Sequence, residues 1–378
     1  MTHTQSFIRS TWVLAVACLT SCEISEEQVC MPLTDRVLLV YLGGDNNLSG
    51  ETYQKIEAIK EGLIQADATN CKVLVYHDPA NATPVLTELK SRNKQLTSDT
   101  VAIYSEENSA SPSVFARIIN EIKEKYPAKA CGLLLFSHAS GWLPQGTLNS
   151  LALRSVIMDG NTEMEIAAFA AAIPDRTFDF IVFEACFMAG IEIAYQLKDK
   201  TDYIFASTAE IVSPGFTEIY PQALTYLLNG NLTAFAAQAF DYFDRQEGEM
   251  RSATFSLIQT DRLQPLARFI AANCQLNRNV DPHTVQHFDR NRAFHLFFDF
   301  EDYYSRLLDS EVQQTEFQRL TDECVIWKQT TSSFLIYSNG FYINHYSGLT
   351  VYIQQNNFPS LNTRYEETAW QKAIFSTN

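Results

Sequence analysis

Two stretches of this 378-residue chain end an apolar run at a residue that can transfer protons or attack a carbonyl. In CGLLLFSHASGW, residues 131–142, the run stops at His138. In FDFIVFEACFMAGIEIAYQL, residues 178–197, a similar run stops near Glu184, and Cys186 follows it. A thiol within hydrogen-bond reach of an imidazole forms a nucleophile with its proton acceptor. The two stretches therefore predict covalent catalysis, provided that the runs are neighbouring strands.

The elements that must position these residues alternate between strand and helix. Continuous β-branched and aromatic runs begin at residues 36, 72, 132 and 178, and such runs are typical of strands buried on both faces of a parallel sheet. Helical patterns lie between them at residues 49–66, 111–127 and 163–174. This alternation predicts an α/β fold with a doubly wound, mostly parallel sheet.

Ligands of such sheets bind beyond the carboxyl ends of the strands. The polar residues expected at that edge are Asp45, His77, Asp78, His138, Glu184 and Cys186. Adjacent strands lie about 4.8 Å apart, so the histidine and the cysteine would be within reach of each other. A helix is expected to begin just after the cysteine, where its dipole would favour the thiolate. Either residue alone would more often be a core cysteine or a surface histidine, but their joint placement makes a catalytic dyad an equal alternative to that interpretation.

The second half of the chain has a different pattern. From about residue 221, helical patterns at 231–246 and 260–276 mix with strand patterns at 251–259 and 345–355, and no Pro/Gly-rich linker separates the halves. We therefore expect a catalytic core of residues 36–225 and a C-terminal extension of residues 226–378 packed on it. Residues 1–21 are expected to be a signal peptide and residues 22–35 a tether.

Several motifs together resemble the clostripain family of cysteine peptidases, in the clan of caspases, legumain and gingipains. They are VYLGGDNNLSG, FSHASGW, FEACFMAGIEIAYQL and ASTAEIVSPGFTEIYPQAL, with weaker similarity in HYSGLTVYI and TRYEETAWQKAIF. The resemblance implies a caspase-like three-layer sandwich with a mostly parallel central sheet. It also implies that Cys186 attacks the scissile carbonyl, that His138 protonates the leaving amine, and that the backbone amides of Ala139 and Cys186 hold the oxyanion.

The resemblance further implies cleavage of peptide or protein substrates after Arg or Lys, with an acidic group in the specificity pocket. Glu184 stands where relatives have aspartate, and Glu210 is a second candidate for that group. Two features depart from the family pattern. His138-Ala139 replaces His-Gly, which would exclude a backbone conformation open only to glycine, and Glu184 is one methylene longer than aspartate.

Some family members mature by cutting a loop between the histidine and cysteine strands. Arg154 is the only basic residue in LPQGTLNSLALRSVIMDG, which fills that interval. Self-cleavage after Arg154 and an ordinary loop or strand role for it both remain open.

The N-terminal sequence MTHTQSFIRSTWVLAVACLTSC predicts an export signal whose apolar stretch is too short to span a bilayer. Its end, LTSC, resembles the bacterial lipobox, which implies that Cys22 carries acyl chains. The protein would then be exported and anchored by lipid to the bacterial cell envelope, at the outer membrane or the periplasmic face. A plain secretory signal that ends near a cysteine is the alternative.

Composition and spacing disfavour several other classes of function. The chain has 28 Lys and Arg against 44 Asp and Glu, a formal net charge of −16, so nucleic-acid binding is disfavoured. No C-x-x-C spacing occurs, and His283 with His287 lacks a third ligand, so we expect no metal site. Thiol chemistry needs no cofactor; calcium enters as an accessory only through the family resemblance.

The leading hypothesis is thus a cysteine endopeptidase that uses a Cys186/His138 dyad. The alternative is a non-catalytic, lipid-anchored peptide- or protein-binding protein on the same fold. An esterase or amidase that uses Ser137 or Ser140 is disfavoured, because neither serine lies in a G-x-S-x-G elbow.

Overall fold

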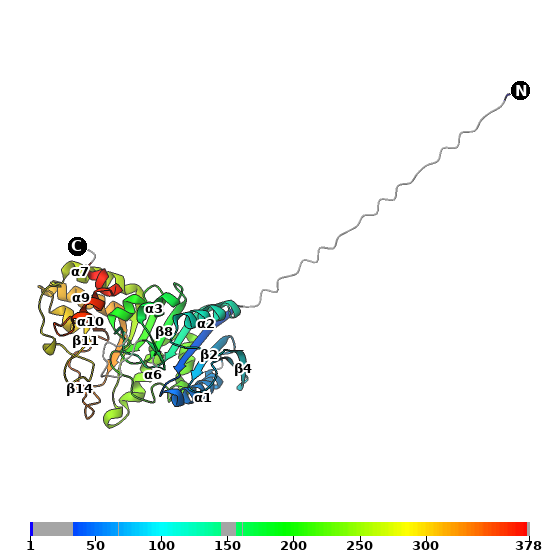
Figure 1. Ribbon diagram of the computed structural model, residues 1–378, viewed down its shortest axis with the longest axis horizontal. Coiled ribbons are helices and arrows are strands. Elements are labelled where there is room, and N and C mark those ends of the chain that lie inside the picture. Colours follow the sequence, from blue (N-terminus) through cyan, green and yellow to red (C-terminus); the bar gives the residue numbers. More distant parts are fainter. Residues whose placement is uncertain (3–32, 67, 145–155, 161, 376–378) are drawn as a thin grey trace. The chain divides into compact units, whose positions relative to one another are not determined.

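The computed structural model describes residues 1–2, 33–66, 68–144, 156–160 and 162–375, and Leu33–Asn378 forms one compact unit. A nine-stranded sheet runs through that unit in the order β12-β10-β9-β8-β5-β1-β2-β3-β4 (Figure 1). Its centre is parallel and consists of β1 (Thr34–Gly44), β2 (Cys71–Pro79), β5 (Ala128–Phe136), β8 (Phe178–Glu184) and β9 (Thr201–Ser207). The expected α/β fold and mostly parallel sheet are confirmed.

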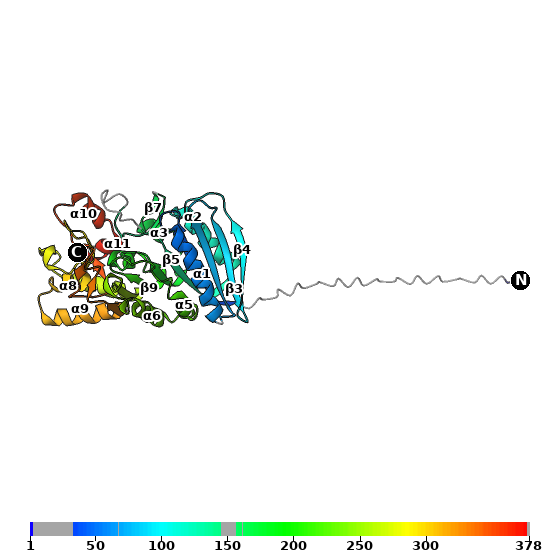
Figure 2. The ribbon, with the colours of Figure 1, turned by 90° about the horizontal axis from the view of Figure 1, so that it is seen from below.

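Antiparallel strands complete both edges of the sheet, as Figure 2 shows for β3 and β4. They are β3 (Val85–Arg92) and β4 (Gln95–Ile103) on one edge, and β10 (Thr254–Gln259) and β12 (Val325–Thr330) on the other. The β3–β4 hairpin was not expected from the sequence. Its two-residue turn, Asn93–Lys94, has positive φ at both positions, and β4 is mostly exposed and polar, so no apolar run marks it.

Helices cover both faces of the sheet, which makes it the middle layer of three (Figure 1). One face carries α1 (Ser49–Ala66), α5 (Tyr220–Asn229) and α6 (Leu232–Asp244). The other carries α2 (Pro112–Lys125), α3 (Ile166–Ala172), α4 (Ile191–Gln196) and α7 (Leu263–Asn273). In β1, Leu38 and Val40 pack under the first group, whereas Val37 and Leu39 pack under the second. Burial on both faces explains why the central strands are continuously apolar.

The C-terminal half belongs to the same sheet as the N-terminal half. Phe255 of β10 pairs with Ser207 of β9, so no structural boundary separates residues 36–225 from residues 226–378. The remaining elements are β6 (Ile157–Asp159), β7 (Thr162–Met164), β11 (Phe298–Asp299), α8 (Phe300–Ser305), α9 (Glu311–Cys324), β13 (Ser333–Phe334), β14 (Phe341–Tyr342), β15 (Thr350–Val351), α10 (Pro359–Glu366) and α11 (Ala369–Phe375).

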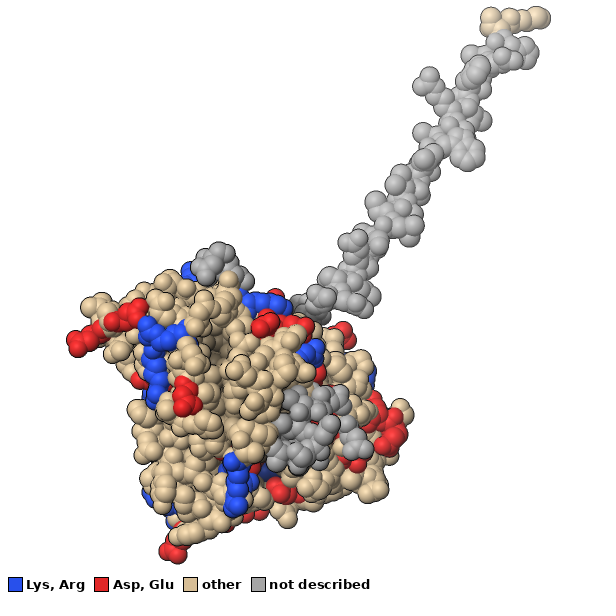
Figure 3. Space-filling model, turned by 60° about the vertical axis from the view of Figure 1, so that its left-hand side comes forward, with Lys and Arg blue, Asp and Glu red and all other residues tan. Residues whose placement is uncertain are grey.

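Two surface properties bear on function. Among the described residues, no helix combines the length and the apolar character that crossing a membrane requires. On the face drawn in Figure 3, basic and acidic side chains are interspersed, and no continuous basic surface is seen there. That face therefore offers no track for a phosphate backbone.

Gly62 tests the close contact between α1 and α5. A Cβ added there would lie 2.3 Å from the Tyr220 carbonyl oxygen and 2.8 Å from Leu224 Cβ. We expect Gly62→Ala to lower the free energy of unfolding by about 1–3 kcal/mol, as overpacking does. Gly50→Ala, in the same helix, would meet nothing within 4 Å and should be neutral or stabilise by up to about 1 kcal/mol. If urea denaturation gives the same free energy of unfolding for both variants, the close contact between α1 and α5 at Gly62 is contradicted.

Candidate active site

The register between β5 and β8 places His138 and Cys186 just beyond the ends of neighbouring strands. The two strands are parallel neighbours, and Phe136 pairs with Glu184. His138 and Cys186 each follow two residues beyond this pair, at the same level of the carboxyl edge. With a strand spacing of about 4.8 Å, this placement suits a nucleophile and its proton acceptor. The expectation that the two apolar runs are neighbouring strands is confirmed.

The histidine ring is oriented by the loop that follows β1. His138 Nε2 lies 2.7 Å from Asn47 Oδ1. The loop is fixed in turn by Asn46, whose Nδ2 donates to the Met158 carbonyl oxygen at 3.0 Å and whose Oδ1 accepts from the Leu48 amide at 2.8 Å. The sequence analysis missed Asn47. The sequence feature that could have indicated Asn47 is the GGDNN motif, which lies at the end of β1, the strand next to β5.

The turn that follows Cys186 is held in an uncommon backbone conformation. Phe187, directly after Cys186, has a φ of 60°, a left-handed value that costs a non-glycine residue about 1–2 kcal/mol. Its amide donates to the Ala209 carbonyl oxygen at 2.9 Å, and its ring stacks on Phe297 with centroids 4.4 Å apart. Burial and stacking thus hold the turn that presents the thiol, and Phe297 comes from the C-terminal half.

The thiol is protonated at neutral pH. Burial raises the pKa of the Cys186 thiol to about 12; the Glu210 carboxylate also raises it, whereas the Ile211 amide and the Arg290 guanidinium lower it. Stabilisation of a thiolate by a helix directly after the cysteine was expected and is wrong, because α4 begins only at Ile191. The proton must therefore leave the sulfur during attack.

The departure at Ala139 does not disturb the backbone. Ala139 does not have a positive φ; the left-handed position in this loop is Gly141, with a φ of 69°. A glycine-only conformation is therefore not required at residue 139. Within the described part of the chain, neither the Ala139 amide nor the Cys186 amide donates a hydrogen bond. Both donors remain available at the ends of adjacent strands.

Glu184 does not have the environment expected of a pocket carboxylate. It shares a face of β8 with Val182, under α1 and α5, and its side chain is only 1% exposed. Lys55 Nζ lies 2.5 Å from Oε1, the Phe216 amide donates to Oε1, and the Tyr220 hydroxyl donates to Oε2, each at 2.5 Å. Its charge is already neutralised, so the expectation that it binds a substrate cation needs correction.

The Lys55–Glu184 pair fixes the loop between β9 and α5. Lys55 Nζ also donates to the Pro214 carbonyl oxygen at 3.0 Å and to Thr217 Oγ1 at 2.9 Å. Gly215 has a φ of 63°, and a Cβ there would lie 2.2 Å from Glu184 Oε1. The loop can pass this close to the carboxylate only with glycine at that position.

The same loop carries Glu210, the second pocket candidate, to the thiol. Glu210 forms a bidentate ion pair with Arg290, with Nε–Oε2 at 2.6 Å and Nη2–Oε1 at 2.7 Å. Both charges lie close enough to Cys186 to affect its pKa. Arg290 Nη1 also donates to the Ser338 carbonyl oxygen at 2.8 Å. The sequence analysis missed Arg290, which is far from the dyad in sequence and belongs to no motif.

The clostripain family model matches residues 40–370, most of the chain. The chain belongs to the clostripain family. Within that family of cysteine peptidases, an inactive zymogen C11 protease from Parabacteroides distasonis has 32% identity and a TM-score of 0.80, covering 91% of this chain and 99% of that one. This similarity confirms the caspase-like fold.

Two further relatives cover less of the chain. A clostripain from Bacteroides thetaiotaomicron, solved with the peptide inhibitor BTN-VLTK-AOMK, has 26% identity and a TM-score of 0.50, covering 57% of this chain and 97% of that one. Clostripain of Hathewaya histolytica is 26% identical over 211 residues, which are 47% of this chain and 40% of that protein. The match therefore spans less than half of the curated clostripain.

The other expected site residues fall into two groups. Cys22 and Arg154 lie outside the described residues. Ser137 is buried and its Oγ accepts from the Met158 amide at 2.9 Å, which gives it a structural role. His77 Nε2 lies 2.7 Å from Thr52 Oγ1, and burial lowers the pKa of His77 to about 4.

Lys55→Met tests the buried ion pair. The substitution leaves the Glu184 carboxylate buried without a cation, so we expect the free energy of unfolding to fall by about 3–5 kcal/mol. The double variant Lys55→Met/Glu184→Leu removes both charges and should recover part of this loss. Urea denaturation measures both values. A double variant as unstable as the single one would show that lost packing, not an unpaired charge, causes the loss.

Proposed function

We propose that this chain is a cysteine endopeptidase with Cys186 as nucleophile and His138 as the group that moves the proton. The observation that carries the proposal is the β5–β8 register, which places both residues at one level of the sheet edge. Family membership supports the reaction class. The alternative is a peptide-binding protein without activity. Such a protein would not require a thiol, an imidazole and two backbone amides that donate no hydrogen bond at the same edge of the sheet.

The geometry is compatible with a balanced sequence of steps. The Cys186 sulfur attacks the scissile carbonyl carbon while the thiol proton passes to His138. The amides of Ala139 and Cys186 stabilise the oxyanion. His138 returns the proton to the amine as the C–N bond breaks, and water then hydrolyses the thioester with His138 as base. No step needs a metal or another cofactor; calcium is an accessory to test.

For specificity, we propose cleavage after Arg or Lys with Glu210 as the carboxylate that receives the substrate cation. The related clostripain of B. thetaiotaomicron was solved with the inhibitor BTN-VLTK-AOMK, whose peptide ends in lysine. In this chain the Arg290 guanidinium already binds Glu210. A substrate cation must therefore displace or share this internal arginine, which would weaken the preference.

For the location, we propose export and lipid anchoring to the bacterial cell envelope through Cys22. The LTSC motif supports this proposal. Mass spectrometry of membrane fractions would detect acyl chains on Cys22, and an unmodified Cys22 or a soluble mature protein would contradict it.

Cys186→Ala tests the nucleophile. On fluorogenic peptides that end in Arg, Lys, Asp, Asn or an apolar residue, we expect the variant to lose more than about 10³-fold of kcat/KM. Cys274→Ala, which changes another half-buried thiol, is the control and should keep the activity.

The panel is run with calcium and with EDTA, before and after limited proteolysis. Activity that survives Cys186→Ala would disprove the mechanism. A wild-type protein that cleaves none of the peptides under any of these conditions would favour the binding-protein alternative.

Glu210 and Arg290 test the specificity. Glu210→Gln should lower kcat/KM for Arg and Lys peptides by about 10–100-fold, because a charge-assisted pair is worth about 1.5–3 kcal/mol. Arg290→Gln should raise it several-fold, because the competing cation is gone. Arg292→Gln, an exposed neighbour, serves as control. If the wild-type protein instead prefers acidic peptides, and Arg290→Gln abolishes this preference, then Arg290 is the residue that determines specificity.

A further inference from the structure

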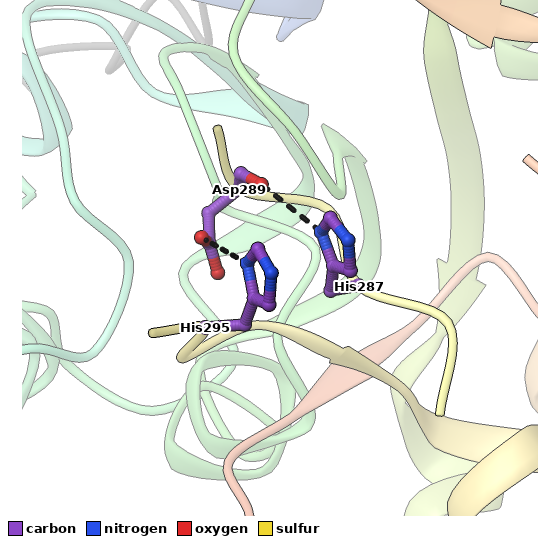
Figure 4. Close-up of side chains that lie close together, drawn as sticks. All are labelled: His287, Asp289 and His295. Atoms are coloured by element: carbon purple, nitrogen blue, oxygen red, sulfur yellow. Dashed lines mark hydrogen bonds and ion pairs between the residues drawn. The ribbon is translucent and has the colours of Figure 1, made fainter. Parts of the chain in front are cut away.

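His287, Asp289 and His295 form a cluster of metal-ligating side chains in the segment between α7 and α8 (Figure 4). One ligand-capable atom from each residue lies within 4.8 Å of the others. The sequence suggested only His283 with His287. In the structure, His283 is exposed on a short 3-10 turn, whereas His287 lies against His295.

Asp289 fixes the protonation of both rings. His287 Nδ1 lies 3.0 Å from the Asp289 carbonyl oxygen, and His295 Nδ1 lies 2.9 Å from Asp289 Oδ1. A carbonyl and a carboxylate oxygen only accept, so each Nδ1 must carry a proton. A neutral imidazole protonated at Nδ1 has its lone pair at Nε2. Metal-ligating histidines are oriented in this way, by a carboxylate or carbonyl oxygen at the other ring nitrogen.

The two lone pairs are presented side by side. The rings are stacked with centroids 3.4 Å apart and planes 10° apart. Figure 4 shows both Nε2 atoms turned to the same side, away from Asp289. Neither Nε2 has a hydrogen-bond partner among the described residues. The lone pairs of two nearly parallel rings run side by side and do not converge, so one ion with Zn–N bonds of about 2.0–2.1 Å can bind both nitrogens only after the rings rotate out of the stack.

Two backbone amides hold the Asp289 carboxylate in place, and the His295 ring beside it is partly exposed. Asp289 Oδ2 accepts from the amides of Leu296 at 2.7 Å and Phe297 at 3.2 Å. The Asp289 side chain is 6% exposed and that of His295 is 20% exposed. Burial, and then the neighbouring His295, lower the pKa of His287, so this ring is uncharged at neutral pH. Asp289 therefore acts as the orienting group, and part of the His295 side chain reaches solvent.

We propose that His287 and His295 bind one divalent transition-metal ion, such as Zn²⁺, Ni²⁺ or Cu²⁺, through their Nε2 atoms, with water completing the coordination. Imidazole nitrogen favours these ions over Ca²⁺ and Mg²⁺, which prefer oxygen ligands. The site is not part of the proposed chemistry. Because Arg290 directly follows Asp289 and binds Glu210, the bound ion would stiffen the segment that reaches the thiol.

The test uses the full chain with Cys186→Ala, which removes the thiol of the dyad as a competing ligand. Competition with a zinc-binding dye should show one Zn²⁺ bound at pH 7.5 and weaker binding at acidic pH, because protons compete with the ion for the imidazole nitrogens. Adding His287→Gln or His295→Gln should weaken the binding at least tenfold. His283→Gln, a matched exposed histidine, should leave it unchanged.

Electron paramagnetic resonance of bound Cu²⁺ adds a measurement that needs no histidine substitution. Two coupled nitrogens are expected in the Cys186→Ala protein. The proposal is overturned if that protein binds no ion, if both histidine variants bind Zn²⁺ as tightly as it does, or if fewer than two nitrogens couple to Cu²⁺. Circular dichroism without metal checks the fold of each variant.

Discussion

The buried ion pair between Lys55 and Glu184 determines where the loop beside the thiol can lie. Removing two charges from water costs several kcal/mol per ion, and the cost is offset only when the remaining hydrogen-bonding groups are also satisfied. Both side chains meet this condition. Lys55 also donates to the Pro214 carbonyl and the Thr217 hydroxyl, and Glu184 also accepts from the Phe216 amide and the Tyr220 hydroxyl. One interaction thus joins α1, β8, α5 and the loop that brings Glu210 and Ile211 to Cys186.

The two candidate pocket carboxylates show how far a family motif determines chemistry. Glu184 and Glu210 are both glutamates near the dyad, but a lysine 129 residues away in sequence neutralises the first. Arginine from the C-terminal half binds the second. The side chain of Lys55 is fully buried, and no motif in the sequence marks it as the partner of Glu184. The partner of a charge is a tertiary property, and residue spacing in a sequence does not encode it.

The parts that could be predicted are those with strong local signals. The continuous apolar strands identified the central sheet, and their polar ends identified His138 and Cys186, because burial on both faces leaves a clear pattern. The β3–β4 hairpin was missed because β4 is exposed and polar. The sequence did not reveal the roles of Asn47 and Arg290, because each depends on contact between segments that are remote in sequence. It did not reveal the contact between His287 and His295, because that contact depends on how an irregular loop folds.

The stacking of Phe187 on Phe297 joins the turn after Cys186 to a residue of the C-terminal half of the chain. A ribosome releases both dyad residues well before it releases Phe297, β10 and β12. A nascent chain at that stage would lack the ring that stacks on Phe187 and would leave an edge of β9 unpaired. Until β10 is made, the chain would therefore expose a strand edge to which another chain could add.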